Sequence, residues 1–306
     1  MLTTLFNNLL ALLITMLTGA LLAKFWLITP ELRQGLNKLL YYFALPLFIF
    51  NSMRESMTLE LLQTSYYPLL FGAGLALVNG LVAVLVAAIW RIHPAERRLF
   101  AFLNMFGNNI YLGLPIAHAL FGAQGVAVVL LYSFGSDLIL WSLGQWLLAK
   151  SARFSVSNLK QVFNPTFVAL LVGTGAGIVD WELPSVIESS LSNMASVTSP
   201  LALLLTGAAL AEVRLGTAQG GRQALALVIS KLLISPLLAA ALVSILPLAN
   251  DTKTLIVILA SMPTFVRSIV LSDRFGWEGQ KTALGVLATT LGCFVTLPLI
   301  LRLIQQ

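Results

Sequence analysis

Four polar side chains able to bind an ion or a solute lie inside otherwise apolar stretches of the sequence: Asn108, Asn109, Asp137 and Arg267. Amide groups donate and accept hydrogen bonds, and a guanidinium binds a carboxylate through two parallel hydrogen bonds. An acid inside hydrocarbon is a candidate proton carrier or cation ligand. We therefore interpret the two asparagines and Arg267 as candidate anion-binding groups, and Asp137 as the candidate ion-coupling group.

Each of these side chains has an alternative role. A guanidinium in the middle of a membrane helix costs roughly 3 kcal/mol and needs a partner. Arg267 either binds a substrate carboxylate, pairs permanently with Asp137 or snorkels to the interface. The asparagines either bind a ligand or join helices by hydrogen bonds. The same choice applies to Asn104, which shares a helical face with Asn108 through their spacing of four.

Helix-breaking residues lie at mid-membrane depth in two of the apolar stretches. Residues 104–115 contain Gly107 and Gly113 and end at Pro115, and residues 260–268 contain Pro263. Proline removes a backbone hydrogen bond and glycine loosens the helix. Backbone groups freed in a membrane must face protein or water, where half-helix ends can bind charged ligands. We expect Pro115 and Pro263 to mark broken helices that form a binding site; a proline kink without function is the alternative.

Five further side chains are weaker candidates. Asn51, Ser52 and Thr206 follow prolines that a repeat, described below, aligns, and we expect them to line the cavity opposite the broken helices. Lys231 lies deep in an apolar stretch, where it is either functional or snorkelling. His118 lies near the end of its stretch, either as a pH-sensing group or as an amphipathic interface residue.

Ten apolar stretches position these residues. Of the 306 residues, 58% are hydrophobic and 10% are charged, against about 25% charged in soluble domains. A spanning helix needs roughly 20 apolar residues, and helices satisfy their own backbone groups in lipid. The sequence predicts an all-α integral membrane protein with ten transmembrane helices. We expect the first of them to be a retained membrane span and not a cleaved signal peptide. The stretches lie at 5–26, 36–53, 65–90, 97–118, 124–149, 164–179, 193–211, 223–247, 254–272 and 281–304.

The basic residues predict the orientation, because Lys and Arg stay on the cytoplasmic side. The connections after odd-numbered stretches hold 13 of the 18 Lys and Arg residues, and the opposite set holds 3. We therefore expect a protein of the cytoplasmic membrane that has both termini outside the cytoplasm. Since the basic residues lie singly or in small groups between apolar stretches, we interpret them as topology signals and expect no nucleic-acid partner.

An internal repeat relates the two halves of the chain. A shift of 154 positions superposes Pro30 on Pro184, Pro46 on Pro200, Gly19 on Gly173, and residues 121–125 on 275–279. Each half has five stretches, so the second enters the membrane from the opposite side. We expect two inverted repeats, at 1–150 and 151–306, with broken, crossing helices 4 and 9. Such repeats are typical of secondary transporters, while a channel or a structural membrane protein is the alternative.

The motifs around these breaks resemble the auxin efflux carrier family, the bacterial relatives of the plant PIN proteins. The resemblance covers nearly the whole chain. It is carried by Gly107-Asn108-Asn109 with Leu112-Gly113 and Pro115, by Phe121-Gly122 and Gly125, by Phe43–Phe50, by Ser199–Gly207 and by Ser261–Pro263.

The resemblance implies a ten-helix fold, organic-anion substrates such as auxin or malonate, transport by alternating access and a homodimer. It leaves open the coupling ion, and a sodium- or proton-coupled carrier using Asp137 is the first alternative. A non-transporting membrane sensor is the second. The sequence lacks a nucleotide-binding loop and a zinc-protease motif, so we expect neither an enzyme nor a cofactor. The single cysteine, Cys293, has no disulfide partner in the chain.

Overall fold

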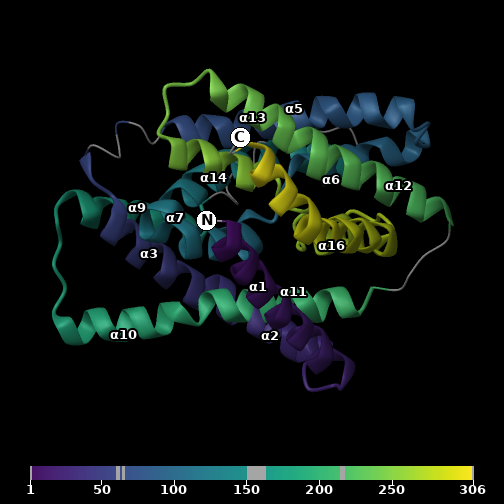
Figure 1. The fold of residues 1–306 in the computed structure, drawn as a ribbon. Helices are drawn as coiled ribbons and strands as arrows, with labels where there is room; N and C mark the ends of the chain where they lie inside the picture. Colours follow the sequence, from purple (N-terminus) through teal and green to yellow (C-terminus); the bar gives the residue numbers. More distant parts are fainter. Residues whose placement is uncertain (1, 60–62, 64–65, 150–162, 214–217, 305–306) are drawn as a thin grey trace.

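Helices and their connections make up the described chain, which comprises residues 2–59, 63, 66–149, 163–213 and 218–304 of this computed structural model (Figure 1). The helices of the first half are α1 (Leu2–Lys24), α2 (Pro30–Leu39), α3 (Leu45–Ser56), α5 (Tyr66–Ile89), α6 (Arg97–Met105), α7 (Leu114–Ile139) and α8 (Gln145–Leu148). Those of the second half are α9 (Pro165–Ile178), α10 (Ser185–Ser196), α11 (Thr198–Ala211), α12 (Ala218–Ile229), α13 (Ser235–Ser244), α14 (Asn250–Ala260), α15 (Ser268–Arg274) and α16 (Gly279–Ile304).

Short turns of other helix types interrupt this series. A 3-10 turn precedes α6, and π-helical turns connect α2 to α3, lead into α7, and connect α7 to α8 and α12 to α13. Their bounds are Pro94–Glu96 for the 3-10 turn, and Leu40–Ala44, Asn109–Gly113, Leu140–Gly144 and Ser230–Ile234 for the π-helical turns.

Within the described residues, six helical segments are long and apolar enough to cross a membrane. They are Asn7–Lys24, Tyr66–Ile89, Asn109–Leu148, Ser185–Ala211, Gly220–Ser244 and Gly279–Leu303. The other four predicted stretches do not form a single helix of this length and apolarity, each for a physical reason. The stretch at 36–53 lies in a helix whose first part, α2, is polar, and α9 has 14 residues. The stretches at 97–118 and 254–272 are each interrupted, as their breakers predict.

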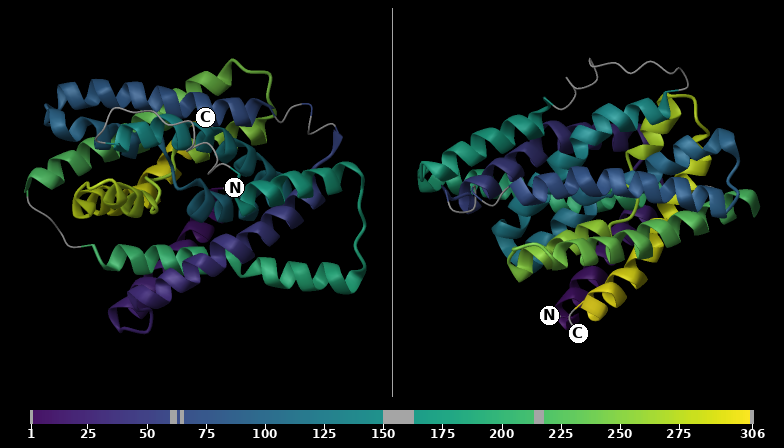
Figure 2. Two further views of the ribbon diagram at one scale, coloured as in Figure 1. Left: turned by 180° about the vertical axis from the view of Figure 1, so that it is seen from behind. Right: turned by 90° about the horizontal axis from the view of Figure 1, so that it is seen from above.

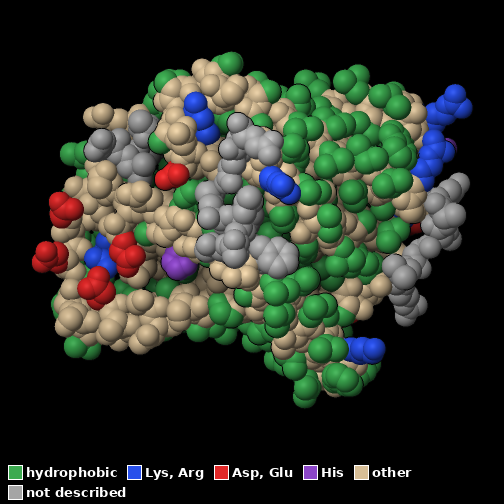
Figure 3. All heavy atoms as spheres, in the orientation of Figure 1, with side chains coloured by type: hydrophobic (Ala, Val, Ile, Leu, Met, Phe, Trp, Pro, Cys, Tyr) green, Lys and Arg blue, Asp and Glu red, His purple; other side chains and the backbone are tan. Residues whose placement is uncertain are grey.

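Apolar side chains cover much of the outside of these helices. On α5, the side chains of Leu81, Val84, Leu85 and Ile89 are all more than 60% exposed. A helix that is apolar on all sides suits lipid rather than water. The green surface in Figure 3 shows the same property over a large part of one face. The structure therefore agrees with a multi-pass membrane protein.

Two helices, α2 and α9, begin at a side-chain cap. The Thr29 hydroxyl accepts a hydrogen bond from the Leu32 amide, and Pro30 occupies the first turn of α2. The Asn164 side chain accepts from the amides of Thr166 and Phe167 at the start of α9, again before a proline. A proline in the first turn loses no helical hydrogen bond. Because this capped start is polar, α2 begins six residues before the predicted apolar stretch.

Two glycines allow α1 and α11 to cross closely. A Cβ atom added to Gly19 would lie 2.0 Å from the Leu204 carbonyl oxygen, and one added to Gly207 would lie 1.8 Å from that of Met16. Small residues at such crossings let membrane helices pack backbone to backbone. This contact joins the first helix to a helix of the second half, across some 190 positions of the sequence.

The two ends of the bundle differ in charge. Acidic side chains gather at the end where α9 leads into α10 (Figure 3). There the Arg54 guanidinium lies 2.5 Å from the Glu188 carboxylate. The chain termini lie on one side of the molecule in the view from above (Figure 2, right).

Candidate functional site

The first broken helix ends at Met105. Phe106 takes an extended conformation (φ −116°, ψ 127°), and the helix resumes at Asn109 after Asn108 (φ −81°, ψ 56°). Glycine and asparagine are poor helix formers, which explains the position of the break. Pro115 lies further on, buried in the first turn of α7, so Gly107 and Asn108 mark the break rather than the proline.

The second broken helix ends at Ala260 and resumes at Ser268. Its connecting segment runs antiparallel to the first one, with a bridge between Gly107 and Thr264. The backbone N–H of Asn108 donates to the Pro263 carbonyl at 2.7 Å, and the Thr264 hydroxyl donates to the Leu103 carbonyl at 3.0 Å. The breaks therefore lie against each other, and each satisfies backbone groups that the other leaves free.

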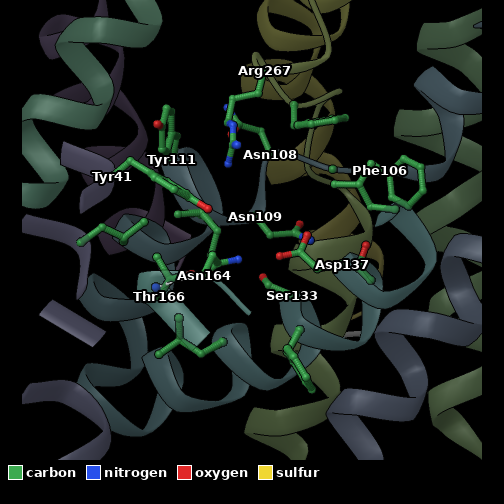
Figure 4. Close-up of a pocket in the computed structure, with 18 of the residues that line it drawn as sticks. Tyr41, Phe106, Asn108, Asn109, Tyr111, Ser133, Asp137, Asn164, Thr166 and Arg267 are labelled. Carbon is green, nitrogen blue, oxygen red and sulfur yellow. Dashed lines mark hydrogen bonds between the residues drawn. The ribbon is translucent and has the colours of Figure 1, made fainter. Parts of the chain in front are cut away.

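A cavity of about 110 Å³ lies beside this crossing (Figure 4). Its walls come from the π-helical turn before α3 and α3 itself, from both breaks, from the second half of α7 and from the start of α9. A volume of this size holds several water molecules, hence a small solute. The polar side chains that line it are Tyr41, Asn108, Asn109, Tyr111, Ser133, Ser136, Asp137, Asn164, Thr166 and Arg267.

Three buried polar atoms in this wall have no protein partner among the described residues. They are Asn108 Nδ2, Asn109 Oδ1 and Ser133 Oγ. An unpaired buried polar group costs about 1–3 kcal/mol, so such groups cluster where water or a ligand completes them. One donor, one acceptor and one hydroxyl thus face the same cavity, a set that suits a polar solute.

Arg267 supplies the positive charge of the site. Its guanidinium stacks on the Tyr41 ring, with 4.8 Å between the guanidinium carbon and the ring centroid. It is directed into the cavity near Asn108 (Figure 4). The cation–π contact orients the guanidinium fork, and Arg267 also donates a hydrogen bond to the Tyr41 side chain. The other N–H groups of the fork can bind an acceptor in the cavity.

Asp137, on α7, lines the same cavity and is half-buried. The ion pairs found among the described residues do not include Asp137 with Arg267. A permanent salt bridge between these two residues, one of the roles open from the sequence, is therefore absent from this structure.

A second, larger cavity of about 970 Å³ adjoins the first. Tyr41, Tyr111 and Arg267 line both cavities. The larger one is also lined by Arg33, Lys38, Arg274 and Glu212, and Arg33 lies 2.8 Å from the Glu212 carboxylate. The three basic residues belong to connections that the orientation rule assigns to the cytoplasm. Arg267 and Tyr41 thus lie at the boundary between the small cavity and a wide basic vestibule.

The other predicted site residues lie apart from the small cavity. Asn104 is buried and hydrogen-bonded to Ser230 and to the Phe100 carbonyl. The Asn51 amide donates to Glu55 at 3.1 Å. Thr206 lines the larger cavity, while its hydroxyl donates to Ala202 within its own helix.

Two remaining candidates, Ser52 and His118, are also absent from the cavity walls. Ser52 is buried in α3, and the exposed His118 packs edge-on against Phe48 with 5.9 Å between ring centroids.

Several residues that line the small cavity were not predicted from the sequence. Ser133 lies one turn before Asp137 on α7, and this spacing of four was a usable signal. Asn164 and Thr166 precede and follow Pro165, a pattern typical of a helix start and therefore of a polar half-helix end. Tyr41 had no such signal, because its position depends on the tertiary fold.

Comparison with known proteins gives a consistent result. A family model described as membrane transport protein matches residues 4–301. An uncharacterized transporter of Methanocaldococcus jannaschii is 23% identical over 289 residues, covering 91% of this chain and 92% of the relative. One from Methanothermobacter thermautotrophicus is 25% identical over 309 residues, covering 96% of each. A protein of Rhizobium meliloti named "Putative malonate transporter" is 24% identical over 291 residues, covering 90% of this chain and 88% of the relative.

These matches point to transport rather than to enzymatic chemistry, and they extend over nearly all of the sequence that surrounds the crossing. The chain therefore belongs to the membrane transport protein family, the auxin efflux carrier-like family that its motifs resemble.

Proposed function

We propose that the protein is a secondary carrier that moves a small organic anion, of the carboxylate class, across the cytoplasmic membrane by alternating access. The observation that carries this proposal is the cavity at the crossing, where Arg267 and the unpartnered polar atoms of Asn108, Asn109 and Ser133 face the same space. The relative named for malonate supports a small carboxylate.

The chemistry of the cavity favours an anion. A carboxylate only accepts hydrogen bonds. The Arg267 guanidinium and the side-chain amide nitrogen of Asn108 are donors that face the cavity. The Asn109 oxygen and the Ser133 hydroxyl suit a second polar group on the same solute, such as a protonated carboxyl or a hydroxyl. The basic vestibule beyond Arg267 raises the local concentration of anions.

The proposal includes the ten-helix inverted repeat, at 1–150 and 151–306. Two pairs of residues with positive φ support it: Trp26 (61°) with Asp180 (49°), and Gly122 (60°) with Gly276 (74°). Both pairs are separated by the 154 positions of the sequence repeat. Left-handed backbone is uncommon outside glycine, so matching turns at one offset favour a shared fold of the two halves.

Uptake of radiolabelled carboxylates into proteoliposomes tests the function. The panel contains malonate and indole-3-acetate, and the proteins are the wild type, Asn108→Ala and the control Asn193→Ala, an exposed asparagine on α10. We expect saturable uptake of one anion by the wild type and the control, and at least tenfold slower uptake by Asn108→Ala at the same protein density. Absence of saturable uptake of every anion in the panel contradicts the proposal.

A second candidate function is coupling of the anion to a proton or a sodium ion through Asp137. The observation that favours it is an acid in the cavity wall without an ion pair to the nearby Arg267. In this case, the dependence of uptake on a proton or sodium gradient disappears in Asp137→Asn, while uptake down the anion gradient persists. An unchanged gradient dependence in that variant eliminates Asp137 as the coupling group.

A further inference from the structure

Lys231 is a buried cation that the proposed anion site does not use. It lies in the π-helical turn between α12 and α13, its side chain is 2% exposed, and it lines none of the cavities described above. A charge in the middle of a membrane helix is costly and marks a functional group with a specific partner. The partner therefore decides what this lysine does.

The partner is the carbonyl end of the first broken helix. Lys231 Nζ donates to the Asn104 backbone oxygen at 2.9 Å, and the neighbouring Ser230 hydroxyl donates to the Asn104 side-chain oxygen at 2.6 Å. Asn104 lies in the last turn of α6, where carbonyls have no donor within the helix and where the helix dipole is negative. The ammonium therefore neutralises the negative end of a half-helix at the crossing.

The equivalent end of the second broken helix carries neutral donors. The Ser235 hydroxyl donates to the Ala260 carbonyl at 3.2 Å, and the Cys293 thiol contacts the Ser261 carbonyl at 3.5 Å. Ser235 follows the π-helical turn that holds Lys231, so one short segment contacts both broken ends. Among the described residues, the two broken ends therefore contact different donors, an ammonium at α6 and uncharged groups at α14.

Freed carbonyls at the ends of discontinuous helices are the groups that bind sodium ions in many carriers. At α6, two of these carbonyls are already used, that of Leu103 by Thr264 and that of Asn104 by Lys231. We propose that the Lys231 ammonium is a built-in cation that replaces a coupling sodium ion at the crossing, so that transport needs no sodium. This inference rests on the proposed function as an anion carrier.

Thermal unfolding of the purified protein tests the cation site without a substrate. The variants are Lys231→Ala, which opens the site, Lys231→Gln, a neutral donor, Lys231→Arg, which keeps the charge, and the control Lys253→Ala, at a half-buried lysine in the first turn of α14. Each is measured in sodium, methylammonium and choline chloride at equal ionic strength.

We expect the Tm of the wild type and of the control to be the same in all three salts. Lys231→Ala should unfold at lower temperature in choline and recover partly in sodium or methylammonium, which are small enough to enter the site. The Tm of Lys231→Arg should be higher than that of Lys231→Gln. A Lys231→Gln Tm equal to that of the wild type overturns the inference, as does a Lys231→Ala Tm that is equal in the three salts. If Lys231→Ala does not fold, the Tm values of Lys231→Arg and Lys231→Gln decide whether the positive charge is needed.

Uptake of malonate into proteoliposomes tests the consequence for transport. Replacing sodium by choline on both sides should change the wild-type rate by less than twofold, whereas Lys231→Gln should lose at least tenfold in choline. A tenfold sodium stimulation of the wild type overturns the inference. A wild type that takes up no anion of the panel contradicts the proposed function instead, and the unfolding measurement still decides the role of Lys231.

Discussion

Arg267 has a fixed orientation, and its fork carries further hydrogen-bond donors besides the one that binds Tyr41. Tyr41 holds the plane of the guanidinium from one side, and the cavity lies along its edge. A lysine at this position keeps the charge but loses the planar fork and its stacking on the ring. The geometry of the guanidinium, in addition to its charge, should therefore decide how a carboxylate binds.

We expect Arg267→Lys to lower kcat/KM for anion uptake at least tenfold, equivalent to about 1.4 kcal/mol, and Arg267→Gln to lower it further. The measurement is initial uptake over a range of anion concentrations in proteoliposomes with equal amounts of protein. The control is Arg302→Lys, an exposed residue near the end of α16. Equal kcat/KM values for wild type and Arg267→Lys argue against bidentate binding.

Part of the site could be predicted from residue types alone. Asn108, Asn109, Asp137 and Arg267 line one cavity because buried polar groups in a membrane protein converge on the same wet space. Asn104 could not be distinguished from Asn108 in the same way. The two share a helical face in an unbroken helix, but the break at Phe106 separates them, and Asn104 faces Ser230 instead.

At the scale of elements, close helix crossings should tolerate no added atoms. Gly207 in α11 contacts the Met16 backbone, whereas a Cβ atom on Gly74 in α5 has no neighbour within 4 Å. The same change to alanine should therefore have opposite effects. Gly207→Ala should destabilise the protein by about 3 kcal/mol through overpacking, while Gly74→Ala should be neutral or stabilising by up to about 1 kcal/mol, since alanine is the better helix former.

Unfolding of the two glycine variants in detergent, followed by Tm, checks this expectation. A Gly207→Ala protein as stable as Gly74→Ala would show that α1 and α11 do not cross as closely as described.

A second element-scale contact joins the start of α6 to α12 and α16. Glu96 accepts hydrogen bonds from Lys281, at 2.6 Å, and from Gln223. Burial raises the pKa of the Glu96 carboxyl, but the hydrogen bonds from Lys281 and Gln223 outweigh this effect, so its pKa lies below the ordinary value of 4.5. The folded state therefore binds the proton less well than the unfolded chain, and this contact stabilises the fold at pH values above about 4.5.

We expect Glu96→Gln to lower the Tm by about 2 °C at pH 7, because partly exposed ion pairs contribute about 1 kcal/mol or less. The difference from the wild type should shrink as the pH falls below 4.5 through the lowered pKa, where the wild-type carboxyl also becomes neutral. Tm values of both proteins between pH 3.5 and 7 measure it. A difference that stays constant over this range assigns the effect to packing.

The existence of the helices was more predictable than their lengths. Apolar stretches mark where helices lie, but α2 and α10 begin before the stretches they belong to, because polar turns continue a helix beyond its apolar part. The first turn of α2 is capped by Thr29, whereas that of α10 has no side-chain cap. The interruptions were predictable from Gly107 and Pro263. The antiparallel pairing of the two breaks depends on contacts between distant segments, such as Asn108 with Pro263, and has no signal in the local sequence.

For the whole molecule, the orientation in the membrane is the property that the charge distribution predicts most directly. The 13 to 3 division of basic residues assigns the connection around Pro94–Glu96 to the cytoplasm and the connection between α9 and α10 to the outside. The acidic end of the molecule coincides with the second of these connections (Figure 3). An alternating-access carrier must expose its site to both of these sides in turn.

Introduced cysteines test this orientation, because the native Cys293 is 1% exposed and should not react with a membrane-impermeant thiol reagent. Ala95 and Glu182 are exposed, one at each end of the bundle. We expect Glu182→Cys to be labelled in intact cells and Ala95→Cys only after permeabilisation, since a charged reagent does not cross the hydrocarbon core. The reverse pattern would place both termini in the cytoplasm, and the basic vestibule lined by Arg33 and Arg274 would then open to the outside.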